Sequence, residues 1–293
     1  MRITSFVNKS IEETGLIIES LLIPIRNIND RLSTNWPVEM LDIIRSNSLT
    51  TITNWYDRNK ETLIKDCKDV AIPLSDINYA PLYRNPNKIW GIGLNYKDHA
   101  KDLSESAPEK IPASFMKPTT TIIGYGNTIN LPLLSERTTG EAELGIIIGK
   151  KTINIDRDNW LDAVAGFTNI IDMTAEDILR KNPRYLTVCK SFDTFFSFGP
   201  QLITPDEIED VMKLEISTKI NGTLYRKNTV SNMTFPPDFL VSFHSKVMTL
   251  LPGDIISSGT PGAVVLNHGD TISCEITGFP ELRNDVEDLK IGK

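Results

Sequence analysis

The sequence predicts an α+β fold that is mainly β, with a small N-terminal α+β unit at residues 1–85 and a larger β-rich unit at residues 86–293. The first part combines short apolar runs with longer segments of helical periodicity. From residue 89 onward, many short runs rich in Ile, Val, Thr and Phe are separated by Gly, Pro and Asn, which is typical of strands and turns. This order favours a sandwich or rolled sheet over alternating βαβ units.

The N-terminal unit is predicted to contain strands at residues 15–20 and 21–29, because both segments are short and apolar. Longer periodic segments, with Ser, Thr or Asn near their starts, predict helices at residues 37–47 and 51–70. Residues 75–88 contain two prolines and are expected to connect the two units.

The larger unit is predicted to be built mostly from short strands. They are expected at residues 89–94, 113–117, 128–130, 142–149, 163–172, 197–204, 214–222, 254–260 and 270–278. Helices are expected at residues 174–182 and at 237–250, the second beginning after a pair of prolines.

Composition narrows the range of partners. The formal net charge of -7 and the pI near 5.1 argue against nucleic acid and anionic membranes, because both favour basic surfaces. No apolar run approaches the length of a spanning helix, and the first residues lack the pattern of a signal peptide, so a cytoplasmic protein is expected. The 3 cysteines are widely spaced and are predicted to be reduced, buried thiols.

Two glutamates come directly before the apolar run at residues 144–149. In an extended strand, Glu141 and Glu143 project the same way, about 7 Å apart along the chain. Asp172 ends another apolar run and is a candidate third carboxylate. Three converging carboxylates would form an oxygen-ligand site suited to Mg²⁺, Mn²⁺ or Ca²⁺ rather than zinc. Spacing alone leaves a second interpretation open, in which Asp172 caps the helix that follows.

Other candidates each have a structural alternative. Lys190 follows an apolar Val-Cys pair and lies either at the surface or in an acidic pocket, where carboxylates would keep it charged. His99 and Asp102 share one face of a helical turn, which suits a general base but also an ordinary exposed turn. The turn containing Gly259 and Thr260 offers backbone N–H groups and a hydroxyl to a carboxylate, or is a simple β-turn.

Seven ordered motifs together resemble the fumarylacetoacetate hydrolase family, from about Lys88 to the C-terminus. They are "GIGLNYKDHAKDL", "FMKPTT", "GEAELGIIIGK", "NIIDMTAED", "CKSFDTFFSFGP", "NGTLYR" and "GDIISSGTPGAV". The resemblance implies a β-rich sandwich or roll, usually dimeric, that carries a divalent metal, commonly Mg²⁺. The small N-terminal unit is common among longer members.

The resemblance also implies roles for individual residues. The implied metal ligands are Glu141, Glu143 and Asp172. The implied catalytic residues are His99, Asp102 and Lys190. The implied substrate contacts are Tyr96, Lys117, Arg226, Gly259 and Thr260. Departures from the family pattern occur at Glu176, where many relatives carry an arginine, and at Leu179 and Arg226.

The implied activity is hydrolysis of a C–C bond in a 2-oxo acid of the acylpyruvate or 1,3-dicarbonyl type, through an enolate held at the metal. Decarboxylation of oxaloacetate, and isomerisation or hydration of 2-hydroxydienoate-type acids, are alternatives within the family. A catalytically inactive relative that binds a metal or ligand is an alternative of another class.

Overall fold

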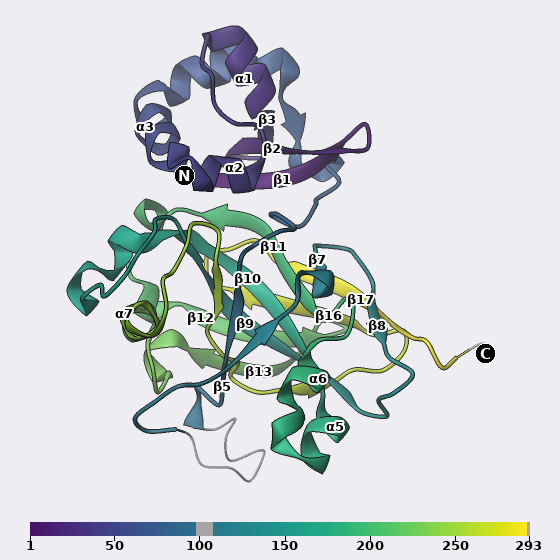
Figure 1. Cartoon of the computed structure of the whole chain (residues 1–293). Coiled ribbons are helices and arrows are strands. Elements are labelled where there is room, and N and C mark those ends of the chain that lie inside the picture. Colours follow the sequence, from purple (N-terminus) through teal and green to yellow (C-terminus); the bar gives the residue numbers. More distant parts are fainter. Residues whose placement is uncertain (98–107, 292–293) are drawn as a thin grey trace.

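The computed structural model describes residues 1–97 and 108–291 and is shown in Figure 1. Within these residues the strands form a 12-stranded sheet and a 5-stranded sheet, with helices at the periphery. Most strands pair antiparallel, and the pairs β14 with β5, β11 with β7 and β17 with β8 are parallel. The structure confirms the prediction of a mainly β, α+β fold with mixed sheets.

The N-terminal part, purple and blue in Figure 1, is an antiparallel set of strands covered by helices. Its elements are β1 (Arg2–Asn8), β2 (Ile11–Ile18), β3 (Leu21–Pro24), α1 (Ile25–Leu32), α2 (Met40–Arg45), α3 (Ser48–Cys67) and β4 (Ile72–Pro73). The predicted strand at residues 21–29 ends early, because the chain turns into α1 directly after Pro24, a residue favoured where a helix begins. The strand β1 was not predicted.

The large sheet runs across the predicted boundary at residue 85. Its order is β4-β3-β2-β1-β11-β10-β9-β14-β5-β6, and β1 pairs with β11 through Arg2 and Ile203. The remaining bounds are β5 (Ile89–Gly93), β6 (Ala113–Lys117), β7 (Ile122–Ile123), β9 (Thr138–Ile148), β10 (Val164–Ala175), β11 (Phe196–Ile203), β14 (Ile255–Ser257) and β15 (Val264–Val265). The division into two domains stays a prediction, but backbone hydrogen bonds join its two sides.

The second sheet has the order β13-β12-β16-β17-β8. Its strands are β8 (Ile129–Leu131), β12 (Glu215–Ile220), β13 (Thr223–Thr229), β16 (Thr271–Ile276) and β17 (Leu282–Asp288). Asn221 and Gly222 join β12 to β13, and both have positive φ, as a tight hairpin turn between two strands requires. The strands β13 and β17 were not predicted.

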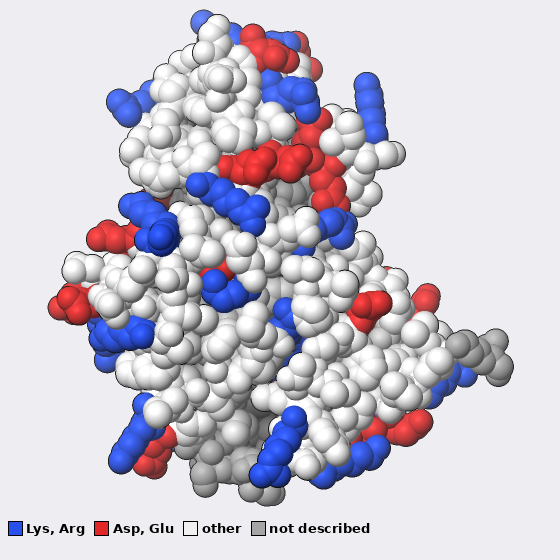
Figure 2. All heavy atoms as spheres, viewed as in Figure 1, with Lys and Arg blue, Asp and Glu red and all other residues white. Residues whose placement is uncertain are grey.

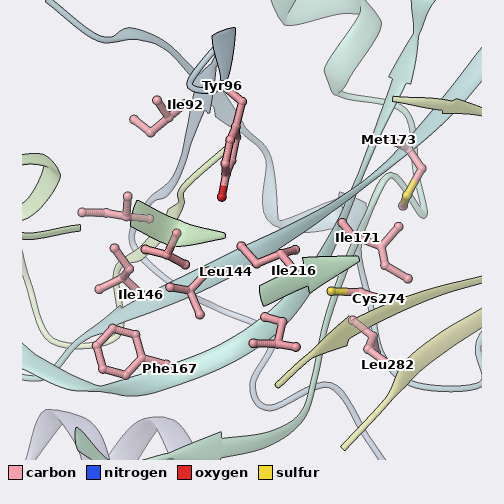
Figure 3. Close-up of a cluster of buried hydrophobic side chains, with 14 of the residues drawn as sticks. Ile92, Tyr96, Leu144, Ile146, Phe167, Ile171, Met173, Ile216, Cys274 and Leu282 are labelled. Atoms are coloured by element: carbon pink, nitrogen blue, oxygen red, sulfur yellow. The ribbon is translucent and has the colours of Figure 1, made fainter. Parts of the chain in front are cut away.

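The main core lies between the two sheets. Figure 3 shows Leu144 and Ile146 of β9 and Phe167 and Ile171 of β10 in one buried cluster with Ile216 of β12. Successive side chains of a strand point to opposite faces, so these residues form the face of β9 and β10 that is turned toward the second sheet.

The opposite face of β9 is buried as well. Ile147 of β9 and Ile170 of β10 belong to a second cluster, together with Ile25, Ile43 and Ile52 of the N-terminal helices. Because both faces of β9 are covered, all of its residues are buried, and its last residues, Ile146–Ile148, are apolar on both faces. The face that carries Ile147 also carries the odd-numbered residues nearer the start of the strand.

Three helices complete the described fold: α5 (Glu176–Lys181), α6 (Leu186–Lys190) and α7 (Pro237–Val247). In the view of Figure 1, α5 and α6 lie at the end of the molecule far from the N-terminal part. On the described part of the face in Figure 2, acidic and basic side chains are intermixed, without the continuous basic band expected of a nucleic-acid surface. No helix in the described ranges is long and apolar enough to cross a membrane.

Candidate metal centre

Two neighbouring strands bring three carboxylates together. Glu141 and Glu143 lie in β9, and Asp172 of β10 is registered directly opposite Glu141. One carboxylate oxygen from each residue lies within 4.8 Å of the others, and all three residues are buried. The predicted common direction of the glutamate pair is confirmed. The helix-cap interpretation of Asp172 is excluded, because β10 continues to Ala175 and α5 begins only at Glu176.

Two buried lysines hold the carboxylates. The Lys117 amine from β6 donates to Asp172 Oδ1 at 2.5 Å, and the Lys190 amine at the end of α6 donates to Asp172 Oδ2 at 2.6 Å and to Glu141 Oε2 at 3.0 Å. Burial alone would lower the pKa of Lys190, but its position between two carboxylates outweighs burial and raises that pKa. Burial lowers the pKa of Lys117, which has one carboxylate partner and is repelled by Lys190.

Glu143 is held by the last residue of β14 and by the turn that follows this strand. Its Oε2 atom accepts a hydrogen bond from Ser257 Oγ at 2.5 Å and another from the Gly259 backbone N–H at 2.8 Å. Gly259 has φ +94°, a conformation that favours glycine. Burial raises the pKa of Glu143 to about 8, and the charges of Asp172 and Glu141 add to this effect.

The donor set fits a divalent cation that prefers oxygen ligands. When ionised, the three carboxylates carry three negative charges and the two lysines two positive charges, so one negative charge remains uncompensated in a buried place. Within the described residues the cluster offers only carboxylate oxygens, the ligands that Mg²⁺ and Mn²⁺ prefer. The raised pKa of Glu143 indicates that a nearby positive charge is needed to keep it ionised at neutral pH.

The triad opens onto a cavity of about 520 Å³. Glu141, Glu143 and Lys190 lie in its wall together with Thr260. Much of the remaining wall is apolar and comes from β5 and the residue after it, from β6 and from the α5–α6 region. These apolar residues are Ile92, Leu94, Ala113, Phe115, Leu179, Pro183 and Leu186. A cavity of this size and composition is typical of a site for a small organic ligand.

The other predicted site residues differ in how they lie relative to the triad and the cavity. Tyr96 is fully buried in the cluster of Figure 3, and within the described residues its hydroxyl has no hydrogen-bond partner. Lys117 contacts the triad but does not line the cavity. Arg226 donates to the Tyr225 carbonyl and lines a different hollow. His99 and Asp102 lie outside the described residues. The predicted substrate contacts of Tyr96, Lys117 and Arg226, and the predicted catalytic roles of His99 and Asp102, stay predictions.

Sequence reasoning missed several contacts. Ser257 and Thr174 donate to Glu143 and Glu141, and Arg180 lies at the cavity wall. Thr174 lies two residues after Asp172 in the same strand, so strand alternation could have placed it on the same face. Ser257 carried no such signal, because its contact depends on the pairing of β14 with β9.

Comparison with known proteins identifies relatives over most of the chain. An uncharacterised protein of Methanocaldococcus jannaschii is 45% identical over 204 residues, which cover 69% of this chain and 84% of that protein. The mitochondrial oxaloacetate tautomerase fahd2 of Xenopus laevis is 34% identical over 248 residues, covering 82% of this chain and 75% of that protein. The crystal structure of maleylpyruvate hydrolase from Sphingobium sp. SYK-6, in complex with manganese(II) ion and pyruvate, matches with a TM-score of 0.77 and 27% identity, covering 98% of this chain and 99% of that chain.

The family model described as fumarylacetoacetate (FAA) hydrolase C-terminal matches residues 88–287. This range begins where the resemblance in the sequence begins, and it includes the triad, both lysines and the turn at Gly259. The chain therefore belongs to the fumarylacetoacetate hydrolase family.

Proposed function

We propose that the protein is a divalent-metal-dependent enzyme that hydrolyses a C–C bond in a small 2-oxo acid of the acylpyruvate type. The observation that carries this proposal is the buried triad of Glu141, Glu143 and Asp172, whose two glutamates lie in the wall of a cavity that Lys190 also lines. The similarity to a maleylpyruvate hydrolase crystallised with manganese and pyruvate supports the same class of substrate.

A divalent ion held by the triad would act as a Lewis acid toward the carboxylate and keto oxygens of the substrate. Lys190 has three N–H donors, and its two carboxylate contacts leave one for a substrate oxygen that becomes negative. Thr260 lies in the cavity wall, and its hydroxyl, which donates to the Gly262 carbonyl at 3.2 Å, would turn toward the substrate carboxylate to bind it, the role that the family motif implies. These residues bind and orient the acid and stabilise its negative charge.

Hydrolysis also requires a base that activates water. Within the described residues no histidine lines the cavity, since His244 is buried against the Leu240 carbonyl and His268 contacts the backbone of Asp288. His99, supported by Asp102, is the proposed base, as the motif around it implies. The choice of hydrolysis therefore depends on residues outside the described ranges.

Keto–enol isomerisation of the same kind of acid is the second candidate. It moves a proton next to the carbonyl and requires no attack by water, so the triad and Lys190 suit it equally. The 34% identity with an oxaloacetate tautomerase favours this candidate. Both reactions place negative charge on the oxygen that Lys190 would face.

The test is a panel of acylpyruvates and oxaloacetate, incubated with the purified protein and Mg²⁺, with products identified by NMR. Pyruvate and a second carboxylic acid are expected from the acylpyruvates, and His99→Ala should stop their formation while metal content is unchanged. Loss of the enol form without cleavage would favour the tautomerase instead, and release of CO₂ from oxaloacetate a decarboxylase. No turnover of any acid, in protein that binds metal, would contradict the proposal.

Two further properties are part of the proposal. Mg²⁺ is the proposed ion, with Mn²⁺ and Ca²⁺ as alternatives that suit the same oxygen ligands. A homodimer is proposed from the family resemblance, and the cytoplasmic location stays a prediction. Metal analysis and light scattering of the purified protein test the ion and the oligomeric state.

A further inference from the structure

The helix α5 places a charged pair in the wall of the cavity, away from the triad. Glu176 and Arg180 both line the cavity, and their spacing of four residues puts them on one face of the helix. Within the described residues, Arg180 forms no hydrogen bond or ion pair with the triad or with its two lysines. The cavity therefore has a second charged region.

Glu176 is buried and bound by two arginines. Its Oε1 atom accepts from Arg180 Nη2 at 2.7 Å and from Arg180 Nε at 3.2 Å, while its Oε2 atom accepts from Nε of Arg137, the residue just before β9. One carboxylate thus meets two guanidinium groups, so the three side chains carry one net positive charge. Of the two arginines, Arg180 is the one that lines the cavity.

The contact with Glu176 orients Arg180 but occupies only some of its N–H donors. A guanidinium has five N–H donors, and two of them point at Glu176. In the described part of the chain the other three have no partner, and 60% of the side chain is exposed. A guanidinium held on one edge and open on the other is suited to binding a carboxylate.

The wall around these charges is apolar. Leu179, Leu186 and Phe115 line the same cavity. A ligand that contacts both the triad and Arg180 would pass these side chains and would need carbon atoms in its middle. The cavity volume of about 520 Å³ leaves room for an acid longer than pyruvate.

We infer that Arg180, positioned by Glu176, binds the second carboxylate of a 2-oxo dicarboxylic acid whose 2-oxo acid end lies at the triad. Arg180 is then a specificity-determining residue that favours dianionic over monoanionic substrates. This inference rests on the proposed function, because the triad is what binds the 2-oxo acid end.

The test compares pairs of unreactive acids that differ only at the far end. Binding of 2-oxoglutarate and 2-oxopentanoate, and of 2-oxoadipate and 2-oxohexanoate, is measured by calorimetry with saturating Mg²⁺. The unaltered protein is expected to bind the dicarboxylic member of at least one pair tenfold or more tightly. Arg180→Ala should remove that preference by weakening the dicarboxylic acid alone, and Arg180→Lys should restore part of it.

A matched control is available in the same helix. Lys181 is exposed and does not line the cavity, so Lys181→Ala removes the same charge nearby and should leave the preference unchanged. Circular dichroism and metal content verify that each variant is folded. If Arg180→Ala is unfolded, the comparison is made with Arg180→Lys and Arg180→Gln.

The outcomes separate this inference from the proposed function. If the unaltered protein binds none of the acids in the presence of Mg²⁺, the 2-oxo acid site itself is wrong. If it binds both members of each pair equally, the 2-oxo acid site stands and the role of Arg180 is wrong. Equal weakening of both members by Arg180→Ala would also overturn that role, since it would show that the arginine acts only through Glu176 and the local structure.

Discussion

Replacing Lys117 with methionine should destabilise the protein mainly when no divalent ion is bound. Lys117 and Asp172 are both fully buried and form an ion pair of 2.5 Å. Removing one partner of such a pair costs about 3–5 kcal/mol, and the lower end applies because Asp172 keeps Lys190 at 2.6 Å. At about 2–4 °C per kcal/mol, the melting temperature should fall by about 6–12 °C.

A bound divalent ion should remove most of this deficit, because it brings more positive charge to the carboxylates than the lysine did. Thermal unfolding of Lys117→Met and of the unaltered protein is compared in EDTA and in saturating Mg²⁺. Lys181→Met, at an exposed position, serves as the control for loss of a lysine. The reasoning is refuted if Lys117→Met lowers the melting temperature equally with and without Mg²⁺, because the ion and the amine would then not neutralise the same charges.

Glu141→Ala should abolish binding of Mg²⁺ or Mn²⁺ without unfolding the protein. Unchanged metal content by elemental analysis would show that the triad does not bind the ion. Gly259→Ala should weaken metal binding at least tenfold, because φ is +94° and an added Cβ would lie 2.7 Å from a neighbouring side chain, which would displace the N–H group that donates to Glu143. Gly269→Ala is the control, since φ there is +83° and the space around it is open. Equal effects of the two substitutions on metal binding, measured by calorimetry, would show that backbone strain alone is responsible. Glu176→Gln should lower thermal stability at neutral pH, and the gap should close as the pH falls below 4.5. Burial would raise the pKa of Glu176, but hydrogen bonds and charges from two arginines outweigh burial and lower that pKa. The ionised carboxylate therefore stabilises the fold until it is protonated. A difference in melting temperature between Glu176→Gln and the unaltered protein that persists at low pH would contradict this.

The triad was predictable because its geometry is local to two strands. Alternation along one strand sets the common direction of Glu141 and Glu143, and an apolar run ending in a carboxylate marked Asp172. The contact of Lys117 with Asp172 spans 55 residues of sequence, and no periodicity signals such a pair. Arg180 was missed for the same reason, since its place in the cavity wall depends on where α5 packs.

The fold was predictable where the strands are apolar and less so where they are not. Apolar runs located most central strands, including β9 and β10, but β9 begins at Thr138 rather than at residue 142, and β10 ends at Ala175 rather than at residue 172. In β17, buried Leu282, Asn284 and Val286 alternate with exposed charged residues, a period-two pattern that the high charge concealed. The strand β1 mixes polar and apolar residues, and its partner β11 lies about two hundred residues away, so nothing local indicated their pairing.

The pairing of β1 with β11 bears on how the protein can be shortened. A protein that began after residue 85 would keep the whole range matched by the family model, residues 88–287. It would also lose the strand that pairs with Gln201, Leu202 and Ile203, so the backbone N–H and C=O groups of β11 that face β1 would be unpaired beside apolar side chains that the N-terminal helices now cover. Such an open strand edge recruits strands from other molecules, so the shortened protein is expected to aggregate even though every residue of the candidate metal centre is retained.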